Sequence, residues 1–325
     1  MRKIALGFDS YSIRALGWKA PQLLQYAAEL KLDTIQFSSL NDLESREPVY
    51  LAGVKDQAAR RGIAIEAGMG CICRLSAKFA PDGPPAGERL REGLRAASAL
   101  GSKRLRCYMG NSGDRLQIEA CMEETVRILG SVRSEALDLG VKIALENHAD
   151  LQARELKTII EWAGPEFVGA CLDTGNPVWA IEDPYLALET LAPYVVTTHV
   201  RDSVVFETDR GAAFQWVNLG DGCLDVARFV REFLRFCPAA AMQLETISGG
   251  APTPLPYLDG GFWKAFPKMP AWEFARFLGL VKHGAARMMA PVVEPTGEQQ
   301  RMDLECSLRT ARATLAASCG PVSPN

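Results

Sequence analysis

The chain has 325 residues, 48% of them hydrophobic, and its 36 Lys and Arg and 39 Asp and Glu give a formal net charge of −3. This length fits two average domains or one large α/β barrel, because such barrels commonly exceed about 250 residues. The basic residues are spread along the chain, which argues against a nucleic-acid partner, and the absence of any run of about 18 apolar residues argues against a membrane span.

Short apolar runs alternate with longer amphipathic segments along the chain. Eight of the short runs are predicted strands, at residues 4–8, 34–38, 63–67, 104–108, 142–146, 169–173, 195–200 and 241–246. The helical patterns that follow them cover residues 21–30, 49–61, 87–100, 116–139, 151–162, 184–191, 224–236 and 271–289. Pro21 and Pro184 lie near helix starts, where a missing N–H costs little. Gly62 and Gly140 follow helix ends, where a left-handed residue is favoured.

Eight strands alternating with eight helices predict an α/β fold, a (β/α)8 TIM barrel, over residues 1–290. A doubly wound open sheet is the alternative, but the segment GFDSYSIRALG after the first strand is not a glycine-rich phosphate loop. Residues 291–325 are richer in polar and small residues. We expect them to form a C-terminal extension, with a helix near residues 302–317 that packs on the barrel or on a partner subunit.

Two connections are longer than the others, at residues 203–222 and 248–270. Both follow the carboxyl ends of predicted strands, at the face where barrel enzymes bind their ligands. Long connections without secondary structure are usually lids or disordered segments. The second one contains four aromatic residues, Tyr257, Phe262, Trp263 and Phe266, which favour an ordered lid.

The last four predicted strands each end in a polar residue. Strand five ends ALENH, strand six CLDTGN, strand seven TTHVRD and strand eight QLETI, which makes the candidate metal ligands Glu146, Asp173, His199 and Glu245. Adjacent strands of a barrel would place all four on one rim. Three carboxylates and an imidazole suit one divalent ion. We expect Mn²⁺, with Mg²⁺, Co²⁺, Zn²⁺ or Fe²⁺ as alternatives. The other interpretation is that each is simply the first polar residue after a buried strand.

The cysteines give no second metal site. Nine scattered cysteines are typical of a reducing compartment rather than a disulfide framework, so we expect a cytoplasmic protein. Cys71 and Cys73 form a C-x-C pair, but no second pair or nearby histidine completes a zinc set. A structural role is therefore expected for both.

The motifs LENH, LDTGNP, THVRD, LGDG and QLET resemble those of the xylose isomerase-like barrels, also described as the sugar phosphate isomerase/epimerase group. The opening LGFDSYSIRALGW is also similar, and the resemblance runs to about Met289. It implies a single divalent ion held by the four candidate ligands. In the ketose 3-epimerase branch the two glutamates also move the proton, so Glu146 and Glu245 would act as general base and general acid beside a metal-bound carbonyl, through an enediolate.

The chain departs from the 3-epimerase pattern at two positions. Asn176 stands where those enzymes usually carry a histidine, and Val205 stands where they tend to carry an arginine. Arg201, two residues after His199, instead resembles the basic residue of the H-x-K/R-D pattern of inosose dehydratases and hydroxypyruvate isomerases. The resemblance therefore supports the group more strongly than it supports 3-epimerisation.

Several other polar or aromatic residues are candidates with a structural alternative. His148 is a candidate acid or base, or it makes a hydrogen bond within its loop, and Asn147 is expected to be structural. The candidate substrate-binding residues are Arg201, Asn176, Glu66 and Trp263. Arg201 can equally form a salt bridge with Asp173 or Asp202, and Trp263 and Trp179 can equally pack in an aromatic core. Asp221 is expected to form a turn or helix cap, and His283 to lie on a helix surface.

The leading functional hypothesis is a metal-dependent isomerase or epimerase of a sugar, keto-sugar or polyol. The alternative is a lyase or dehydratase at the same site, acting on a keto-inositol, a dehydroshikimate or a 3-keto-glycoside, because both reactions begin by removing a proton next to a carbonyl. An apurinic endonuclease would need more than the three histidines present and a basic face. A non-catalytic barrel that binds a sugar is the non-enzymatic hypothesis. A homodimer or homotetramer is expected.

Overall fold

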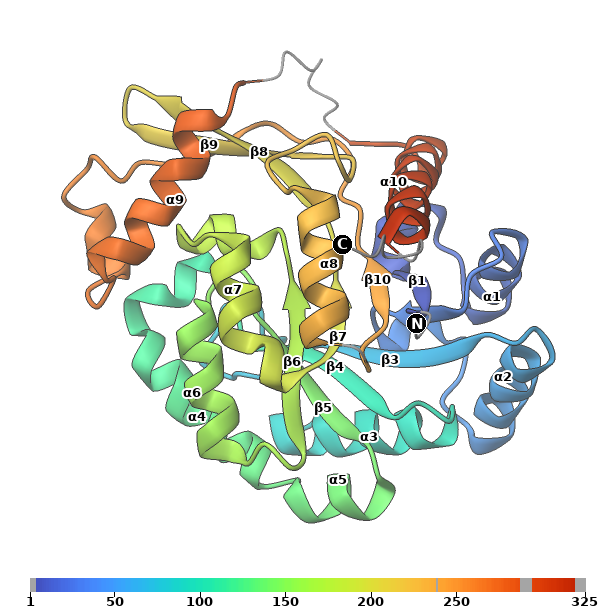
Figure 1. Cartoon of the computed structure of the whole chain (residues 1–325). Helices are drawn as coiled ribbons and strands as arrows, with labels where there is room; N and C mark the ends of the chain where they lie inside the picture. Colours follow the sequence, from blue (N-terminus) through green and yellow to red (C-terminus); the bar gives the residue numbers. More distant parts are fainter. Residues whose placement is uncertain (1–3, 238, 287–293, 319–325) are drawn as a thin grey trace.

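The computed structural model describes residues 4–237, 239–286 and 294–318. Eight parallel strands form a barrel surrounded by helices (Figure 1). The barrel strands are β1 (Leu6–Asp9), β2 (Thr34–Phe37), β3 (Ala64–Cys71), β4 (Arg104–Tyr108), β5 (Lys142–Glu146), β6 (Val168–Asp173), β7 (Val195–His199) and β10 (Met242–Leu244). The ring closes between β7 and β10, where the Val200 N–H donates to the Gln243 carbonyl at 2.7 Å and the Glu245 N–H donates to the Val200 carbonyl at 3.1 Å. The predicted TIM barrel is confirmed.

The helices follow the strands in alternation. They are α1 (Ala20–Glu29), α2 (Pro48–Arg60), α3 (Ala86–Ala99), α4 (Ile118–Gly130), α5 (Arg133–Leu139), α6 (Ala153–Ala163), α7 (Pro184–Leu191), α8 (Val226–Phe236), α9 (Ala271–His283) and α10 (Gly297–Ser318). The predicted helix 116–139 is divided into α4 and α5 after the Gly130-Ser131 pair, where helices commonly kink. The predicted helix 271–289 ends at His283, and its last three predicted residues lie outside the described part of the chain.

The connections after β7 and β10 contain a second sheet that the sequence pattern did not predict. β8 (Asp202–Thr208) and β9 (Gly211–Val217) form an antiparallel hairpin, and β11 (Thr253–Leu255) pairs with β9. Gly211 has φ 140° at the hairpin turn, a conformation that glycine adopts without strain. The second sheet and α9 enclose an apolar cluster separate from the main core, which includes Phe214, Leu255 and Phe277.

The C-terminal helix α10 packs on the barrel of its own chain. Leu304, Leu308 and Ala311 are buried in the main apolar core. The Gln300 side chain accepts the Ala15 N–H at 2.9 Å, and the Ser307 hydroxyl accepts the Leu219 N–H at 3.1 Å. Figure 1 shows α10 beside the amino-terminal part of the barrel. This face of α10 is therefore occupied within one chain.

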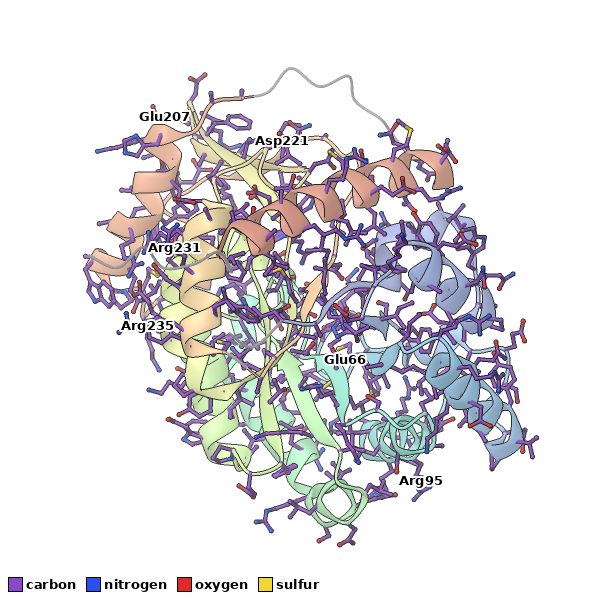
Figure 2. The ribbon with its side chains drawn as sticks, turned by 45° about the vertical axis from the view of Figure 1, so that its right-hand side comes forward. Glu66, Arg95, Glu207, Asp221, Arg231 and Arg235 are labelled. Atoms are coloured by element: carbon purple, nitrogen blue, oxygen red, sulfur yellow. The ribbon has the colours of Figure 1, made fainter. Side chains whose placement is uncertain are left out.

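Charged side chains of α3 and α8 lie on the outside of the barrel. Figure 2 shows Arg95 of α3 and Arg231 and Arg235 of α8 on the outside, whereas Glu66 lies in the interior. Glu66 is 3% exposed. In the described residues no helix combines the length and the apolar character needed to cross a membrane.

Candidate metal centre

Four side chains from adjacent strand ends meet inside the barrel rim. Glu146 ends β5, Asp173 ends β6, His199 ends β7 and Glu245 directly follows β10. One ligand atom from each of the four lies within 4.8 Å of the others, and all four side chains are buried. The carboxyl ends of parallel strands share one face of a barrel, so one residue per strand suffices to build the cluster.

His199 is oriented by its outer ring nitrogen. Nε2 lies 2.5 Å from the Gln36 Oε1 atom and 3.5 Å from an Asp9 oxygen. Since the Gln36 oxygen can only accept a hydrogen bond, Nε2 carries the proton and the lone pair of a neutral ring lies on Nδ1. Nδ1 faces the three carboxylates at 3.4 to 4.0 Å and has no hydrogen-bond partner among the described residues.

This arrangement fits a divalent cation. Three buried carboxylates repel one another, and burial together with the neighbouring glutamates raises the pKa of Asp173 to about 7, although Arg201 opposes the shift. Burial alone would lower the pKa of His199, but the glutamates raise it well above its usual value. A cation among these groups would remove the repulsion and accept the Nδ1 lone pair. The buried group is consistent with a divalent metal site of hard, oxygen-rich character.

Two buried arginines pair with the three carboxylates of the cluster. Arg201 Nη2 lies 2.7 Å from Asp173 Oδ2, and its Nη1 lies 2.7 Å from Glu245 Oε2. Arg106, on β4, forms an ion pair with Glu146. Burial alone would raise the pKa of Glu146, but Arg106 and His199 hold it well below its usual value. Arg106 therefore favours the charged form of Glu146. The second oxygens of Glu146 and Glu245 face His199. Asp173 Oδ2 both pairs with Arg201 and faces His199.

Two asparagines complete the support. Asn147 exchanges two hydrogen bonds with the backbone of Asp173, at 2.8 and 2.9 Å, and so ties β5 to β6. This is the structural role expected for it. Asn176 donates from Nδ2 to Glu146 Oε1 at 2.9 Å, and its backbone N–H donates to Asp173 at 2.7 Å. Asn176 thus positions two ligands, and it also borders the cavity described below.

His148 is held in one tautomer. Its Nδ1 lies 2.6 Å from the Gly110 carbonyl oxygen, so Nδ1 carries the proton, and its ring stacks on Tyr108 with centroids 4.5 Å apart. Burial lowers the pKa of His148 to about 4, and Arg106 contributes to the shift while Glu146 opposes it. The ring is therefore neutral near pH 7 and offers an Nε2 lone pair, which suits a base or a hydrogen-bond acceptor rather than an acid.

A cavity of about 630 Å³ lies at the same end of the barrel, within the usual range for small-molecule sites. Its lining residues are Tyr11, Ser38, Ser39, Gly70, Lys78, Arg106, Tyr108, Asn111, Ser112, His148, Ala149, Asn176, Trp179, Arg201, Trp216, Glu245 and Ile247. The wall combines hydroxyl, amide and charged groups with two tryptophans. Such a lining suits a small polyhydroxylated molecule.

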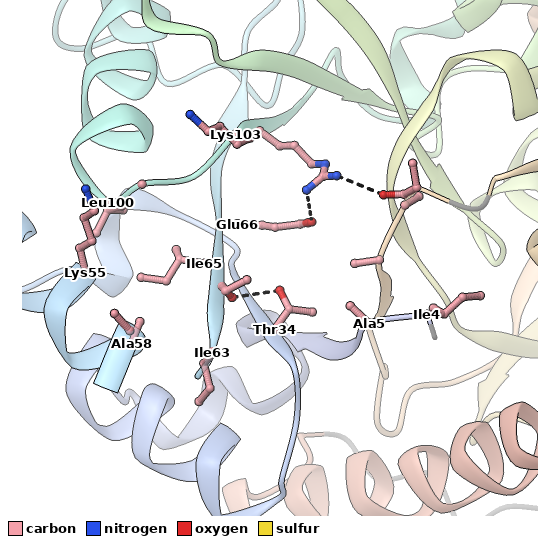
Figure 3. Close-up of a pocket in the computed structure, with 17 residues that line it drawn as sticks. Ile4, Ala5, Thr34, Lys55, Ala58, Ile63, Ile65, Glu66, Leu100 and Lys103 are labelled. Atoms are coloured by element: carbon pink, nitrogen blue, oxygen red, sulfur yellow. Dashed lines mark hydrogen bonds and ion pairs between the residues drawn. The ribbon is translucent and has the colours of Figure 1, made fainter. Parts of the chain in front are cut away.

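Glu66 lies elsewhere. The predicted strand 63–67 would have placed it at a strand end, but β3 continues to Cys71, so Glu66 is near the amino end of the strand. It lines a separate cavity of about 430 Å³ at the amino-terminal ends of the barrel strands, where it meets Arg104 at 3.2 Å (Figure 3). It also accepts a hydrogen bond from Gln36 at 3.0 Å, the residue that orients His199. Its contact with the metal centre is indirect.

Trp263 belongs to the second apolar cluster rather than to the cavity wall. Its Nε1 donates to the Tyr257 carbonyl at 2.8 Å, and its ring packs edge-on against Phe274 with centroids 4.9 Å apart. Trp263 therefore packs in an aromatic core, which was the alternative to a role in substrate binding. Trp179, in contrast, does line the cavity. Cys71 and Cys73 are buried, and Cys71 donates to the Met109 carbonyl at 2.7 Å.

Sequence reasoning missed Arg106, Gln36 and Asp9, which contact the candidate metal ligands. The segment RLRCY of β4 places two arginines at alternate positions of a buried strand. A charge inside such a strand must find a partner, so this pattern was a usable signal. Gln36 and Asp9 lie in β2 and at the end of β1, where a single buried polar residue carries little information.

Asp150 lies two residues after His148 and allows the effect of burial on a carboxylate near the site to be measured. It is 0% exposed, and neither of its carboxylate oxygens has a hydrogen-bond partner among the described residues. Burial raises the pKa of Asp150 to about 8, and Asp114 adds to the shift. The folded chain then binds a proton that the unfolded chain releases above the ordinary pKa of 3.8, so Asp150 lowers stability as pH rises from about 4 to about 8.

We expect Asp150→Asn, which mimics the protonated acid, to raise the free energy of unfolding by about 1–3 kcal/mol at pH 8 and to change it little near pH 4. Urea denaturation at both pH values measures this. Asp202→Asn is the matched control, since Asp202 is also buried but accepts four backbone N–H groups at 2.9 to 3.1 Å, and it should destabilise. A destabilised Asp150→Asn at pH 8 would show that Asp150 is ionised.

Comparison with known proteins identifies a family and two relatives of low sequence identity. A profile of the xylose isomerase-like TIM barrel family matches residues 24–257. A 3-oxo-isoapionate decarboxylase of Pectobacterium atrosepticum is 24% identical over 234 residues, which are 68% of this chain and 78% of that protein. An Escherichia coli protein, YihM, is 29% identical over 115 residues, 35% of this chain and 33% of its own length.

Solved structures agree in fold. The IolI protein with a bound zinc atom superposes with a TM-score of 0.64 at 14% identity and covers 98% of this chain and 100% of its own. A D-psicose 3-epimerase solved in the presence of D-fructose superposes with a TM-score of 0.63 at 15% identity, covering 96% and 99%. The barrel, the match over residues 24–257 and the buried ligand group together identify this chain as a member of the xylose isomerase-like TIM barrel family.

Proposed function

We propose that the protein is a divalent-metal-dependent isomerase or epimerase of a sugar, keto-sugar or polyol. The observation that carries the proposal is the buried group of Glu146, Asp173, His199 and Glu245, with the His199 Nδ1 lone pair facing the carboxylates, at a cavity rich in hydroxyl and amide groups. The D-psicose 3-epimerase and the other epimerases of the same fold support a sugar-type substrate.

The four ligands would hold the ion, and Mn²⁺ is the expected one because oxygen ligands dominate. When bound, such an ion acts as a Lewis acid that withdraws electron density from a carbonyl oxygen and so acidifies the neighbouring C–H. Glu245 lies in the cavity wall, so its carboxylate is placed to take that proton. In the proposed sequence Glu146 takes up a proton from solvent and gives it to the other face of the carbanion, and Glu245 releases the proton it has taken to solvent, so that protons balance over one turnover.

His148 and Asn176 have supporting roles in this proposal. The neutral His148 ring exposes Nε2 at the cavity and would accept a hydrogen bond from, or exchange a proton with, a substrate hydroxyl. Asn176 keeps the Glu146 carboxylate in position through its 2.9 Å hydrogen bond. Trp179 and Trp216 close another side of the cavity and would exclude water from it.

A lyase acting at the same site is the second candidate. The Pectobacterium relative is a decarboxylase of a 3-oxo compound, and the departure from the 3-epimerase pattern at Asn176 points the same way. Loss of carbon dioxide or of water next to a carbonyl passes through the same kind of stabilised carbanion as epimerisation. The ligand group serves either reaction.

Incubation in D₂O with Mn²⁺ distinguishes the two. The substrates are a set of ketoses, keto-sugar acids and 3-keto-glycosides, and the products are analysed by mass spectrometry and NMR. An isomerase or epimerase is expected to place deuterium in a product of otherwise unchanged formula. Loss of water or carbon dioxide would establish the lyase. Absence of any reaction, with less than one Mn²⁺ bound per chain, would refute both and favour a non-catalytic barrel.

We also propose that the protein works in the cytoplasm as a homodimer or homotetramer. Trp162 and Trp272, which are 62% and 58% exposed, are two apolar side chains that a partner subunit would cover in this proposal. Light scattering on the purified protein measures the mass, and the mass of one chain would contradict the oligomer.

A further inference from the structure

The cavity wall carries more positive than negative charge. Lys78, Arg106 and Arg201 line it, and Glu245 is its single carboxylate. Glu245 also belongs to the proposed metal group, so its charge is directed to the ion. The positive charge that is free to bind a ligand therefore depends on which of these three cations already have a carboxylate partner.

Each of the three nitrogens of Arg201 already has a carboxylate partner. Its Nη1 pairs with Glu245 and its Nη2 with Asp173, each at 2.7 Å, and its Nε donates to Asp173 at 3.1 Å. The guanidinium also lies over the Trp216 ring, 4.6 Å from the centroid. Arg201 is therefore a positioning residue for the ligands, and it has little left to offer a substrate.

Arg106 has donors to spare. Its Nη2 pairs with Glu146, its Nη1 makes a 3.5 Å contact with the Met69 carbonyl, and its Nε has no hydrogen-bond partner among the described residues. The residue is only 5% exposed, and a buried donor without a partner is costly. Nε itself is enclosed by protein, so a ligand oxygen would meet the part of Arg106 that lines the cavity, where the only other partner of Nη1 among the described residues is the 3.5 Å contact with Met69.

Lys78 lies on the segment that follows β3, the strand next to β4, which carries Arg106. Its side chain is exposed at the cavity, and no carboxylate of the described residues forms a salt bridge with it. A lysine on an open surface commonly lacks a partner. This one shares a cavity with an arginine that is short of acceptors, beside the hydrogen-bonding side chains of Asn111 and Ser112.

We propose that the substrate carries an anionic oxygen group, a carboxylate or a phosphate, which Lys78 and Arg106 bind. The inference rests on the proposed function for its sugar-type substrate and adds the charge. A neutral polyol would leave both cations with hydroxyl partners that water can replace, whereas an anionic group forms charge-assisted hydrogen bonds, which are about twice as strong as neutral ones. Sugar acids and sugar phosphates are the two classes that combine such a group with a hydroxylated chain.

Calorimetry on the Mn²⁺-loaded protein tests this with matched ligands. D-gluconate is compared with D-glucitol, and D-glucose 6-phosphate with D-glucose. We expect the anion of at least one pair to bind about tenfold more tightly than its neutral partner. Lys78→Met should remove most of that preference and Lys78→Arg should keep it. Lys157→Met, on α6 and paired with Glu161, is the control and should leave it unchanged.

Equal affinities within both pairs would overturn the inference, and so would a preference that Lys78→Met does not reduce, because the anion would then be meeting the metal alone. A preference in the first pair assigns a sugar acid, and one in the second assigns a sugar phosphate. Bound Mn²⁺ is counted separately by electron paramagnetic resonance. A chain that binds no Mn²⁺ contradicts the proposed function, whereas one that binds Mn²⁺ without an anion preference contradicts only this inference.

Discussion

Glu245→Gln is expected to reduce turnover by about 10³-fold while the chain keeps its fold. The amide has the shape of the carboxylate and still gives Arg201 an oxygen acceptor, so the ion pair at 2.7 Å becomes a neutral contact rather than a void. It cannot take a proton, and it is a weaker ligand for a divalent ion. The rate is measured with the substrate found in D₂O, together with Mn²⁺ affinity and thermal unfolding.

Glu182→Gln is the matched control for that experiment. Glu182 is also a fully buried glutamate, but it accepts the Ala153 N–H at 3.1 Å at the start of α6, away from the cavity. Burial raises the pKa of Glu182 to about 8, so an amide resembles its protonated form. Its turnover should match that of the unchanged protein. Full activity in Glu245→Gln would refute the role given to Glu245.

Arg201→Met is expected to lower the free energy of unfolding of the metal-free protein by about 3–5 kcal/mol, the usual cost of removing one member of a buried ion pair. The change leaves Asp173 and Glu245 buried without their cation. Added Mn²⁺ should restore much of the loss, because an ion that binds only the folded chain stabilises it by about 2.7 kcal/mol at a hundred times its Kd. Urea denaturation with EDTA and with Mn²⁺ measures both effects.

Arg276→Met gives the contrast. Arg276 bridges α9 to Asp183 and Glu189 with two contacts of 2.7 Å, but its side chain is 29% exposed and that of Glu189 is 45% exposed. Such pairs contribute about 0–1 kcal/mol, and Mn²⁺ should not correct the change. If Arg201→Met lowered the free energy of unfolding as little as Arg276→Met does, or if Mn²⁺ did not change its effect, Arg201 would not be needed to stabilise the buried carboxylates.

The barrel and the meeting of the four candidate ligands at one rim were predictable because both follow a repeat. Each βα unit returns the chain to the same rim, so Glu146, Asp173 and His199 recur at strand ends in step with the fold. Arg106 and Gln36 were not predictable in the same way, since their roles depend on which residue lies across the barrel. Glu66 was misplaced because β3 extends to Cys71, and nothing in the apolar pattern marks that later end.

The second sheet escaped prediction for a related reason. A Pro- and Gly-rich segment such as 248–270 has the composition of a loop, and its three-residue strand β11 exists only because β9 supplies hydrogen-bonding partners. The pairing joins segments about forty residues apart. Local propensity carries no information on such a partner, whereas an amphipathic helix such as α8 displays its buried face in its own sequence.

The joining of β11 to the β8–β9 hairpin has a consequence for altering the specificity of the protein. Trp216 of β9 lies in the cavity wall, and β9 is also the strand to which the segment after β10 is hydrogen-bonded. A substitution that shifts one of these two segments must shift the other, so their effects should not add. In a library that randomises only one of the two segments, most variants would lose the pairing of β11 with β9. Exchanging both together, as a single cassette from a related barrel, is the way to give this scaffold a new substrate.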